Sequence, residues 1–506
     1  MPTPAEKLAS SLEILRELQE QGRSAIRSAD LSRTHRERLV KSGFLQEVMK
    51  GWYIPSQPGP PAGESTAWYA SFWNFCAVYL QHRFGDAWCL SPEHSLTLHA
   101  GNRTIPRQLL VRSPSARNQI TELPHGTSLL DVRAAMPDPA EIVVQEGLRL
   151  FSVPAALIAC APSFYTAYPA DARAALSMVR SASDLLPRLL EGGHSTIAGR
   201  LAGAMRNIGR ERIAGDIVQT MRAAGYQVQE SDPFSARLPV ILSPRETSPY
   251  VNRLRLMWQQ MRGAVIDLFP PASERLSVDA YLRQVADIYV TDAYHSLSIE
   301  GYRVSSELIE RVRDGKWNPD ANDLDREHRN ALAARGYWQA YQAVRLSLRR
   351  VLKSENPGAV ADEDHGTWYR EMFAPGVTAG LLRPADLAGY RNGQVFIQRS
   401  MHVPPNHEAV RDLMPAFFDL LREEEAPSVR VVLGHFAFVS IHPYMDGNGR
   451  MGRFMMNLMC AAGGYPWTVV PVQERRAYME ALEEASVRQN IVPFTEFLAG
   501  LLTRVP

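Results

Sequence analysis

The chain is organised around one short stretch, Ile441-His442-Pro443-Tyr444-Met445-Asp446-Gly447-Asn448-Gly449-Arg450-Met451-Gly452-Arg453. Apolar residues flank it at 431–440 and 454–462, and each run is typical of a helix buried in a core. Glycines let backbone N–H groups approach an anion, and a helix N-terminus adds partial positive charge. The sequence therefore predicts a turn between two buried helices that can bind an anion.

The charged side chains of this turn indicate chemistry on a magnesium-bound nucleotide. Asp446 is a hard oxygen ligand of the kind that Mg²⁺ combines with phosphate oxygens. Arg450 and Arg453 lie three residues apart on one helix face, and their guanidinium groups match phosphate oxygens. His442 is close enough to Asp446 to accept a proton from a nucleophile that attacks a bound phosphate. The structural alternative is a His-Pro turn followed by a salt-bridged helix that binds nothing.

The stretch resembles the Fic family motif, HxFx(D/E)GNGRxxR, with Tyr444 in place of the phenylalanine and every other specified position matched. The resemblance implies a mostly α-helical domain that transfers AMP from ATP to a Ser, Thr or Tyr hydroxyl of a target protein or of itself. A related branch of the family transfers the γ-phosphate and carries lysine at the second motif glycine. Gly449 keeps the AMP-transfer form.

The same resemblance implies a role for each motif residue, with ATP as substrate and Mg²⁺ as cofactor. His442 would be the general base and Asp446 would hold Mg²⁺ between the α- and β-phosphates. The residues implied in ATP and phosphate binding are Gly447, Asn448, Gly449, Arg450 and Arg453. Those implied in lining the nucleotide pocket are Asn457 and Tyr478.

A second motif lies upstream, at the end of a helical pattern that runs through residues 278–299. Ser296, Glu300 and Gly301 resemble the family's inhibitory motif, (S/T)xxxE(G/N). The resemblance implies that Glu300 pairs with Arg453 and occupies the place that the γ-phosphate needs. An arginine–carboxylate pair is strong when it is partly buried. The alternative is an ordinary helix C-terminus closed by Gly301.

A third feature, residues 390–405, predicts a short hairpin with an exposed edge. In the family a hairpin at this place lies over the active site as a flap and pairs with the backbone of the target protein. The resemblance then implies target docking at Val395, Phe396 and Ile397. A plain surface hairpin is equally compatible with the residues.

Residues 1–58 predict three helices followed by a two-stranded wing around Lys50-Gly51. The second helix is expected near Ala25–Ser28, and Ser32 can cap the third. The region looks like a winged helix-turn-helix, and its local excess of basic residues favours DNA contact. The expected DNA-binding residues are Arg33, Thr34, Arg36, Lys41 and Lys50. A winged helix that binds another protein is the alternative.

Residues 59–244 combine short strand-like runs, at 88–90, 108–111, 128–132 and 142–144, with helical patterns from 170 onward. Together with the preceding winged helix they resemble antitoxin-regulator proteins of the AbiEi type. No catalytic constellation is present among them. We therefore expect an α+β regulatory domain here.

The expected fold class is multi-domain: a mostly α-helical Fic domain with a β-hairpin flap, preceded by a winged helix-turn-helix and an α+β middle domain. The expected domains are 1–58, 59–244, a helical region at 245–350 with the inhibitory motif, and a catalytic core at 351–506. The length of 506 residues suits two to four domains of about 100–200 residues each.

Composition excludes several other classes of protein. The net charge of +1 gives no global case for nucleic-acid or membrane binding. Cys76, Cys89, Cys160 and Cys460 show no metal-binding spacing and predict free, buried thiols. The N-terminus does not resemble a signal peptide, and no apolar run reaches the ~18 residues of a membrane-spanning helix. We expect a cytoplasmic protein with no membrane partner, and a homodimer is compatible with the sequence.

Two functions are compatible with the sequence. One is a protein adenylyltransferase inhibited in cis by Glu300. The other is a DNA-binding transcriptional regulator whose Fic domain senses a nucleotide or modifies itself. Removal of AMP from a target is a further alternative, because Glu300 could position a water molecule.

Overall fold

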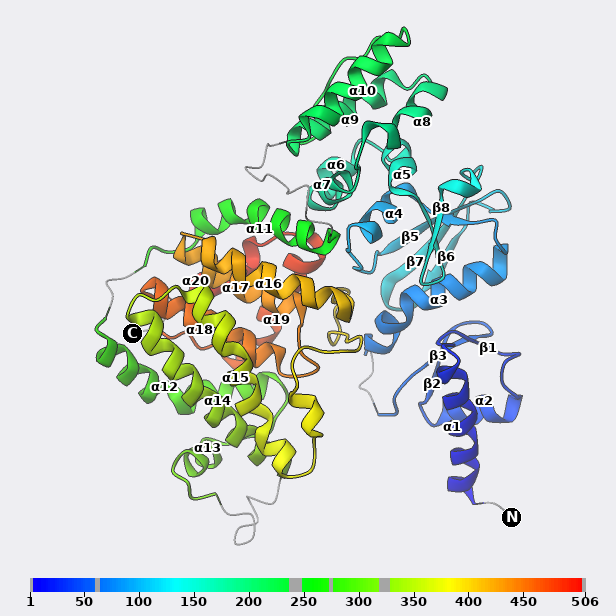
Figure 1. Ribbon diagram of the computed structural model, residues 1–506. Coiled ribbons are helices and arrows are strands. Elements are labelled where there is room, and N and C mark those ends of the chain that lie inside the picture. The colour runs from blue at the N-terminus through cyan, green and yellow to red at the C-terminus, as the bar shows by residue number, and fades with distance from the viewer. Residues whose placement is uncertain (1–2, 60–63, 236–247, 273–275, 318–327, 503–506) are drawn as a thin grey trace. The chain divides into compact units, whose positions relative to one another are not determined.

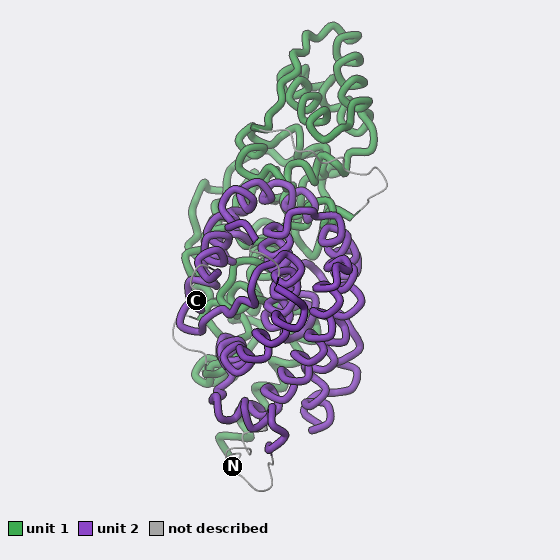
Figure 2. Tube along the Cα trace, turned by 90° about the vertical axis from the view of Figure 1, so that its left-hand side faces the viewer, with its two compact units in different colours: residues 1–253, 396–403 green, residues 254–395, 404–506 purple. Residues whose placement is uncertain are grey.

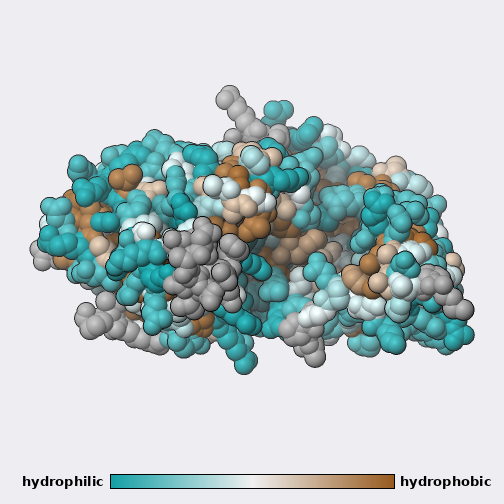
Figure 3. Space-filling model, turned by 90° about the horizontal axis from the view of Figure 1, so that it is seen from below, coloured by the Kyte–Doolittle hydropathy of each residue, from teal (hydrophilic) through white to brown (hydrophobic). Residues whose placement is uncertain are grey.

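The computed structural model describes residues 3–59, 64–235, 248–272, 276–317 and 328–502 (Figure 1). The chain divides into two compact units (Figure 2). The first is Met1–Arg253 with Phe396–Val403, and the second is Leu254–Val395 with Pro404–Pro506. No helix in these ranges is long and apolar enough to cross a membrane. On the face shown in Figure 3, hydrophobic residues form separate patches among hydrophilic ones.

The N-terminal part of the first unit contains α1 (Pro4–Glu20), β1 (Ile26–Arg27), α2 (Arg33–Lys41), β2 (Leu45–Met49) and β3 (Trp52–Pro55). The strands form an antiparallel sheet in the order β1-β3-β2. The expected helix near Ala25–Ser28 is wrong, because Ile26 and Arg27 pair with Tyr53 and Trp52 as β1. Ile26 is β-branched and fully buried, so a strand places it in the core beneath α1 and α2.

The basic residues expected to contact DNA differ in their exposure and in the partners that their side chains already have. Arg33, Thr34, Lys41 and Lys50 are exposed, but Arg33 forms an ion pair with Glu37 at 2.7 Å. Arg36 is partly buried, donates to the carbonyl of Ser28 at 2.9 Å and lies over the ring of Tyr53. Arg36 therefore has a structural role of its own.

A mixed four-stranded sheet follows, made of β4 (Cys89–Leu90), β5 (Gln108–Ser113), β6 (Ile120–Leu123) and β7 (Thr127–Arg133). Its order is β4-β5-β7-β6, with β5 and β7 parallel and the outer pairs antiparallel. The aromatic helix α3 (Thr66–Phe84) shares one core with this sheet, in which Trp68, Phe72, Leu109 and Val111 are buried. Each strand-like run expected from the sequence lies wholly or mostly in a strand.

The remainder of the first unit is a hairpin and a set of helices. The hairpin pairs β8 (Ile142–Gln145) with β9 (Leu148–Phe151). The helices are α4 (Pro92–His99), α5 (Val153–Ala159), α6 (Phe164–Ala167), α7 (Pro169–Ser177), α8 (Leu186–Glu191), α9 (Ser195–Asn207) and α10 (Glu211–Ala223). Alanine and leucine side chains of α5 and α7–α10 form a separate core.

The second unit is helical. Its helices are α11 (Pro249–Leu268), which begins in the first unit, α12 (Val278–Ile299), α13 (Ser306–Arg313), α14 (His328–Leu352), α15 (Pro357–Thr378), α16 (His407–Glu423), α17 (Pro427–Ile441), α18 (Asn448–Gly463), α19 (Arg475–Arg488) and α20 (Val492–Leu502). Helix α18 contacts α12, α14, α15 and α17 (Figure 1). Because it is apolar nearly all round, it is buried on every face. The motif turn therefore leads directly into the N-terminus of the central helix of this unit.

The expected flap takes a different form from the hairpin predicted. Residues 390–405 contain no β-strand, and the whole segment is described. Instead, Phe396–Val403 belongs to the first unit. The backbone N–H of Arg399 donates to Thr66 Oγ1 at 3.1 Å, and its guanidinium pairs with Glu64 at 3.0 Å. The backbone N–H of Arg399 is thus bonded by a residue far away in the sequence, and not by a neighbouring strand of a hairpin.

Candidate active site

The motif turn connects α17 to α18 through two left-handed residues. His442 ends α17 at φ 54°, and Gly447 precedes α18 at φ 80°. A positive φ is costly for histidine, so the surrounding contacts must hold it. The side chain of Asn448 closes the turn: its Oδ1 accepts from Tyr444 N and its Nδ2 donates to Tyr444 O, both at 2.9 Å. The Asn448 side chain thus holds the shape of the turn, and the phosphate contact expected of this residue stays a prediction.

The ring of His442 is oriented for proton acceptance. Its Nδ1 lies 3.2 Å from the carbonyl oxygen of Val439, which can only accept a hydrogen bond. The proton therefore belongs on Nδ1, and Nε2 keeps its lone pair. Burial lowers the pKa of His442 to about 4, an effect that the hydrogen bond to Val439 partly offsets. The imidazole is therefore neutral at physiological pH.

Arg391 holds the backbone around His442, a role that no motif or spacing in the sequence indicated. Its side chain is 1% exposed. Its Nε donates to the carbonyl of His442 at 2.8 Å, and its Nη2 donates to the carbonyl of Pro405. Its own backbone N–H donates to the carbonyl of Pro443 at 2.9 Å. A buried arginine bonded to backbone carbonyls is a rigid support for the strained His442.

Arg450 is buried beside the turn with part of its guanidinium unbonded. Its Cζ lies 5.2 Å from the ring centroid of Tyr302 and 5.1 Å from that of Phe373. Its Nη2 is 3.6 Å from Asp446 Oδ2, a distance that allows ion pairing but not a hydrogen bond. Within the described residues, Nε and Nη2 have no hydrogen-bond acceptor. A buried cation with unfilled donors is a suitable site for an anion.

The structure brings Ser296 and Glu300 of the upstream motif onto Arg453. Arg453 Nε donates to Ser296 Oγ at 2.9 Å, and Nη2 donates to Ser296 O at 2.9 Å and to Glu300 Oε1 at 2.8 Å. The Arg453 side chain is 4% exposed and that of Glu300 is 27% exposed. Gly301 follows at φ 86° and ends the helix that carries both residues. This is the contact that the inhibitory motif predicted.

The carboxylate of Glu300 lies against the first turn of α18. A Cβ at Gly449 would overlap Glu300 Oε1. Burial alone would raise the pKa of Glu300, but the positive charges of Arg453 and Arg450 hold it below its ordinary value. Glu300 therefore stays ionised at neutral pH and occupies an anion position at a helix N-terminus.

A buried network behind Arg453 was also missed by sequence reasoning. His435 Nε2 and the Tyr478 hydroxyl are 2.6 Å apart, and burial lowers the pKa of His435 to about 4. Burial raises the pKa of Tyr478 to about 12, although Arg453 opposes this rise. The sequence signal for this network was His435 within the apolar run 431–440, because a buried imidazole needs a hydrogen-bond partner.

The two residues expected in the nucleotide pocket have structural roles. Asn457 is 1% exposed, and its amide bonds both to Thr468 N, at 2.7 Å, and to Thr468 O, at 3.0 Å. That pairing fixes the orientation of the amide, and the nucleotide contact expected of Asn457 stays a prediction. Tyr478 is also 1% exposed and lies in the His435–Arg453 network.

Asp446 suits a magnesium ion bound largely by phosphate oxygens. Its side chain is 69% exposed, and Oδ1 accepts from the N–H of Gly447 at 2.6 Å. Mg²⁺ commonly takes one or two carboxylates together with substrate phosphates and water. Within the described ranges no cluster of three or more His, Cys, Asp or Glu side chains could hold a metal alone. The site therefore fits an ion that arrives with a nucleotide.

Comparison with known proteins identifies this region. Residues 365–460 match the family model of the Fic/DOC family. The chain is 30% identical to protein adenylyltransferase Fic of Nematostella vectensis over 273 residues, which is 52% of this chain and 60% of the relative. It is also 30% identical to protein adenylyltransferase Fic of Drosophila willistoni, over 44% of this chain and 41% of the relative. The chain thus spans roughly half the length of the curated relatives it matches.

Two solved structures give weaker similarity. Fic-1 from C. elegans is 18% identical, with 66% of this chain and 94% of that chain covered and a TM-score of 0.37. A Fic family protein from Desulfovibrio desulfuricans G20 is 22% identical, with 53% and 74% covered and a TM-score of 0.33. His442, Asp446, Arg450 and Arg453 all lie inside the matched residues 365–460. The chain contains a Fic domain, and the motif turn between α17 and α18 belongs to it.

Proposed function

We propose that this chain is a protein adenylyltransferase, which transfers AMP from magnesium-bound ATP to a Ser, Thr or Tyr hydroxyl of a target protein or of itself. The observation that carries the proposal is a neutral, oriented His442 beside two buried arginines with unused donors. Within the described residues, Arg450 Nε and Nη2 and Arg453 Nη1 have no hydrogen-bond acceptor. Its similarity to curated proteins of that name over about half of their length supports the same activity.

The residues divide the reaction between them. His442 Nε2 accepts the proton of the attacking hydroxyl, whose oxygen forms a bond to the α-phosphorus. The bond from that phosphorus to the α–β bridging oxygen breaks, and diphosphate leaves. The first backbone N–H groups of α18, with Arg450 and Arg453, bind the negative oxygens. Asp446 would hold Mg²⁺, which supplies positive charge to the phosphates when bound.

We further propose that Glu300 keeps the enzyme inactive in cis. Its carboxylate is paired with Arg453 and lies against Gly449, where an outer phosphate of ATP would be bound. ATP that is prevented from using Arg453 would place its α-phosphorus out of line with the nucleophile. Loss of the carboxylate would release Arg453 and correct the alignment.

The test uses purified full-length protein and ATP radiolabelled at the α-phosphate. Glu300→Gly should incorporate label, into itself or into proteins of a lysate, roughly a hundredfold faster than the parent. Glu307→Gly is the matched control, because Glu307 is exposed at the start of α13 and has no ion pair within the described residues. Addition of His442→Ala to Glu300→Gly should abolish labelling. A Glu300→Gly protein that binds ATP yet labels no faster than Glu307→Gly would reject the cis-inhibition proposal.

The same reagents decide between addition and removal of AMP. Protein labelled by Glu300→Gly is repurified and incubated with the unaltered chain and Mg²⁺. Retention of the label supports transfer as the activity. Release of free AMP by the parent, but not by its His442→Ala variant, would instead assign the unaltered chain to AMP removal.

Residues 1–58 support a second, compatible proposal of DNA binding. Lys41 and Lys50 are exposed and have no acidic partner within the described residues. If both lysines bind phosphates, the double variant Lys41→Ala, Lys50→Ala should bind duplex DNA of any sequence more weakly than the parent. The slope of log affinity against log salt concentration should fall by the equivalent of about two phosphate contacts. Lys7→Ala, on the exposed surface of α1, is the control. Salt-insensitive or undetectable binding by the parent would leave this region as a protein-binding module.

A further inference from the structure

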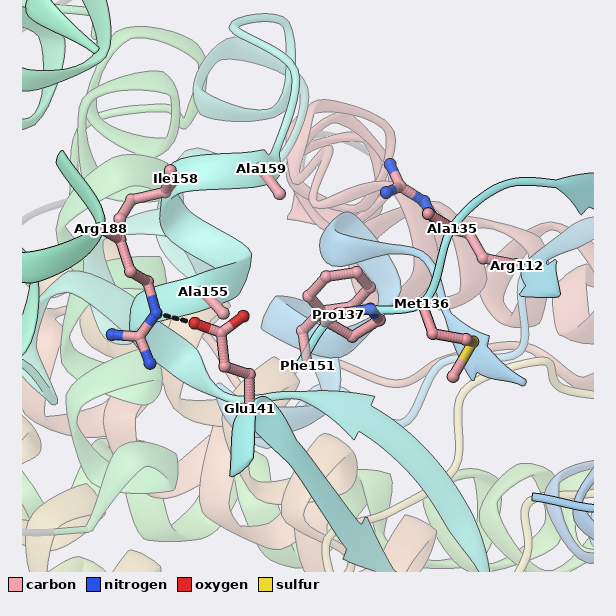
Figure 4. A pocket seen from close by; sticks show the side chains of 10 residues that line it. All are labelled: Arg112, Ala135, Met136, Pro137, Glu141, Phe151, Ala155, Ile158, Ala159 and Arg188. Atoms are coloured by element: carbon pink, nitrogen blue, oxygen red, sulfur yellow. Dashed lines mark hydrogen bonds and ion pairs between the residues drawn. The ribbon is translucent and has the colours of Figure 1, made fainter. Parts of the chain in front are cut away.

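A cavity of about 310 Å³ lies in the first unit, far in the sequence from the Fic motif. It is lined by residues of β5, β9, α5 and α8, of the 3-10 turn Pro139–Glu141 before β8, and of the loop after β7 (Figure 4). Phe151 and Ala155 form an apolar surface within it, and both are nearly fully buried in the protein core. The volume is at the lower end of the range of small-molecule sites, which are ~300–1,000 Å³.

The charged side chains of the cavity differ in their partners. Arg188 forms an ion pair with Glu141, so these two charges neutralise each other (Figure 4). Arg112 lies on the other side of the Phe151 ring in the same view. Its Cζ is 5.4 Å from the centroid of that ring, and no carboxylate or carbonyl within the described residues accepts a hydrogen bond from its side chain. The lining residues together carry one uncompensated positive charge.

We propose that this cavity binds a small organic carboxylate, with the carboxylate on the Arg112 guanidinium and an apolar body over Phe151 and Ala155. A guanidinium presents parallel N–H donors that match the two oxygens of one carboxylate. A single positive charge balances a monoanion, whereas a phosphate dianion would keep an unbalanced negative charge beside Glu141. The apolar surface excludes simple inorganic anions, which bury no hydrophobic area.

Benzoate is the probe, because it joins one carboxylate to an apolar ring that the cavity can hold. Full-length protein is titrated with benzoate while ligand-observed NMR is recorded. Benzamide has the same shape without the charge, phenyl phosphate carries a second charge, and inorganic phosphate lacks the ring. Benzoate should bind at least roughly tenfold tighter than each of the three, since a charge-assisted hydrogen bond and an apolar contact both contribute.

Variants assign the binding to this cavity. Arg112→Gln should weaken benzoate binding roughly tenfold or more. Arg107→Gln is the matched control, because Arg107 precedes the same strand, is exposed and lies outside the cavity. Ala159→Leu adds bulk at an exposed lining position of α5 and should also block binding without disturbing the core. Arg453→Ala should leave benzoate binding unchanged, which separates this site from the Fic motif.

The thermal unfolding midpoint of each variant shows whether it remains folded. Loss of binding in folded Arg112→Gln and in folded Ala159→Leu, with Arg107→Gln like the parent, supports the site. Equal binding of benzoate by Arg112→Gln and by the parent would overturn it, as would no detectable binding by the parent. Tighter binding of phenyl phosphate than of benzoate would overturn the carboxylate assignment. None of these outcomes depends on adenylyltransferase activity.

Discussion

Burial keeps the imidazole of His442 neutral, and only the neutral form can accept a proton as a base. An exposed histidine is half protonated near pH 6.5, but burial lowers the pKa of His442 to about 4. Its ring resonances, assigned with a His442→Gln variant, should therefore stay constant in NMR spectra between pH 8 and about 5.5. A titration centred near pH 6.5 would contradict the structure.

The same shift has a consequence for folding. The folded-state pKa of His442 is lower than its unfolded-state value, so the unfolded chain binds the proton more readily. This contribution to stability is complete above pH 6.5 and is lost as the pH falls toward 4. His442→Gln should therefore lose less of its unfolding free energy over that interval than the parent loses.

Arg391 should affect the rate of transfer and not the affinity for ATP. Its guanidinium supports the backbone of His442 but is not placed to touch a nucleotide phosphate. Arg391→Lys, made in the Glu300→Gly background, keeps the charge and removes the planar set of donors. The kcat should fall roughly tenfold to a hundredfold, because a small displacement of the base costs that much.

The KM for ATP in that variant should stay within about twofold, and the fold should persist. Arg370→Lys, at an exposed site on α15, is the control and should change neither constant. A rise in KM with an unchanged kcat would mean that Arg391 acts on the nucleotide after all.

At the scale of elements, the segment Phe396–Val403 depends on contacts with the start of α3. Glu64 pairs with Arg399, and its side chain is only 11% exposed. Burial favours the neutral form of Glu64, but hydrogen bonds from Thr66 and Arg399 keep its pKa below the ordinary value. Glu64→Gln should weaken this attachment and speed tryptic cleavage after Arg399 by roughly fivefold, because cleavage follows the population of the open segment.

Glu122→Gln is the matched control for that experiment. Glu122 is exposed on β6 in the same unit and forms no ion pair within the described residues. Equal cleavage rates in the two variants would show that the Glu64–Arg399 pair does not hold the segment. If Val395, Phe396 and Ile397 dock a target protein, the Glu64→Gln variant should also change labelling of that target.

At the scale of the whole molecule, the cysteines report on global unfolding. All four are free and buried, and burial raises the thiol pKa, to about 11 for Cys89 and to about 12 for Cys460. This confirms the expectation of buried free thiols. Because the thiolate is the reactive form, a disulfide-exchange reagent at pH 8 should label no thiol in the native protein and all four in denaturant. Rapid native labelling of any one would reveal local opening of its unit.

The sequence by itself determined the local features of the Fic domain. The order of glycines, Asp446, Arg450 and Arg453 specifies a turn and a helix N-terminus, because conformational preference and helix polarity depend on neighbouring residues. The helix pattern around Ser296 and Glu300 was equally local. The strand at Ile26 was not, because a two-residue strand exists only through pairing with Tyr53 and Trp52.

The motif resemblance implied the pair of Glu300 and Arg453, which are 153 positions apart. Only the tertiary structure decided the contacts that no motif names, such as that of the Arg391 guanidinium with the carbonyl of His442, 51 positions away. It also placed the side-chain amides of Asn448 and Asn457 on backbone groups. Composition and periodicity predict which side chains are polar or buried. Which buried donor meets which acceptor depends on the packing of distant helices, and no local pattern encodes that choice.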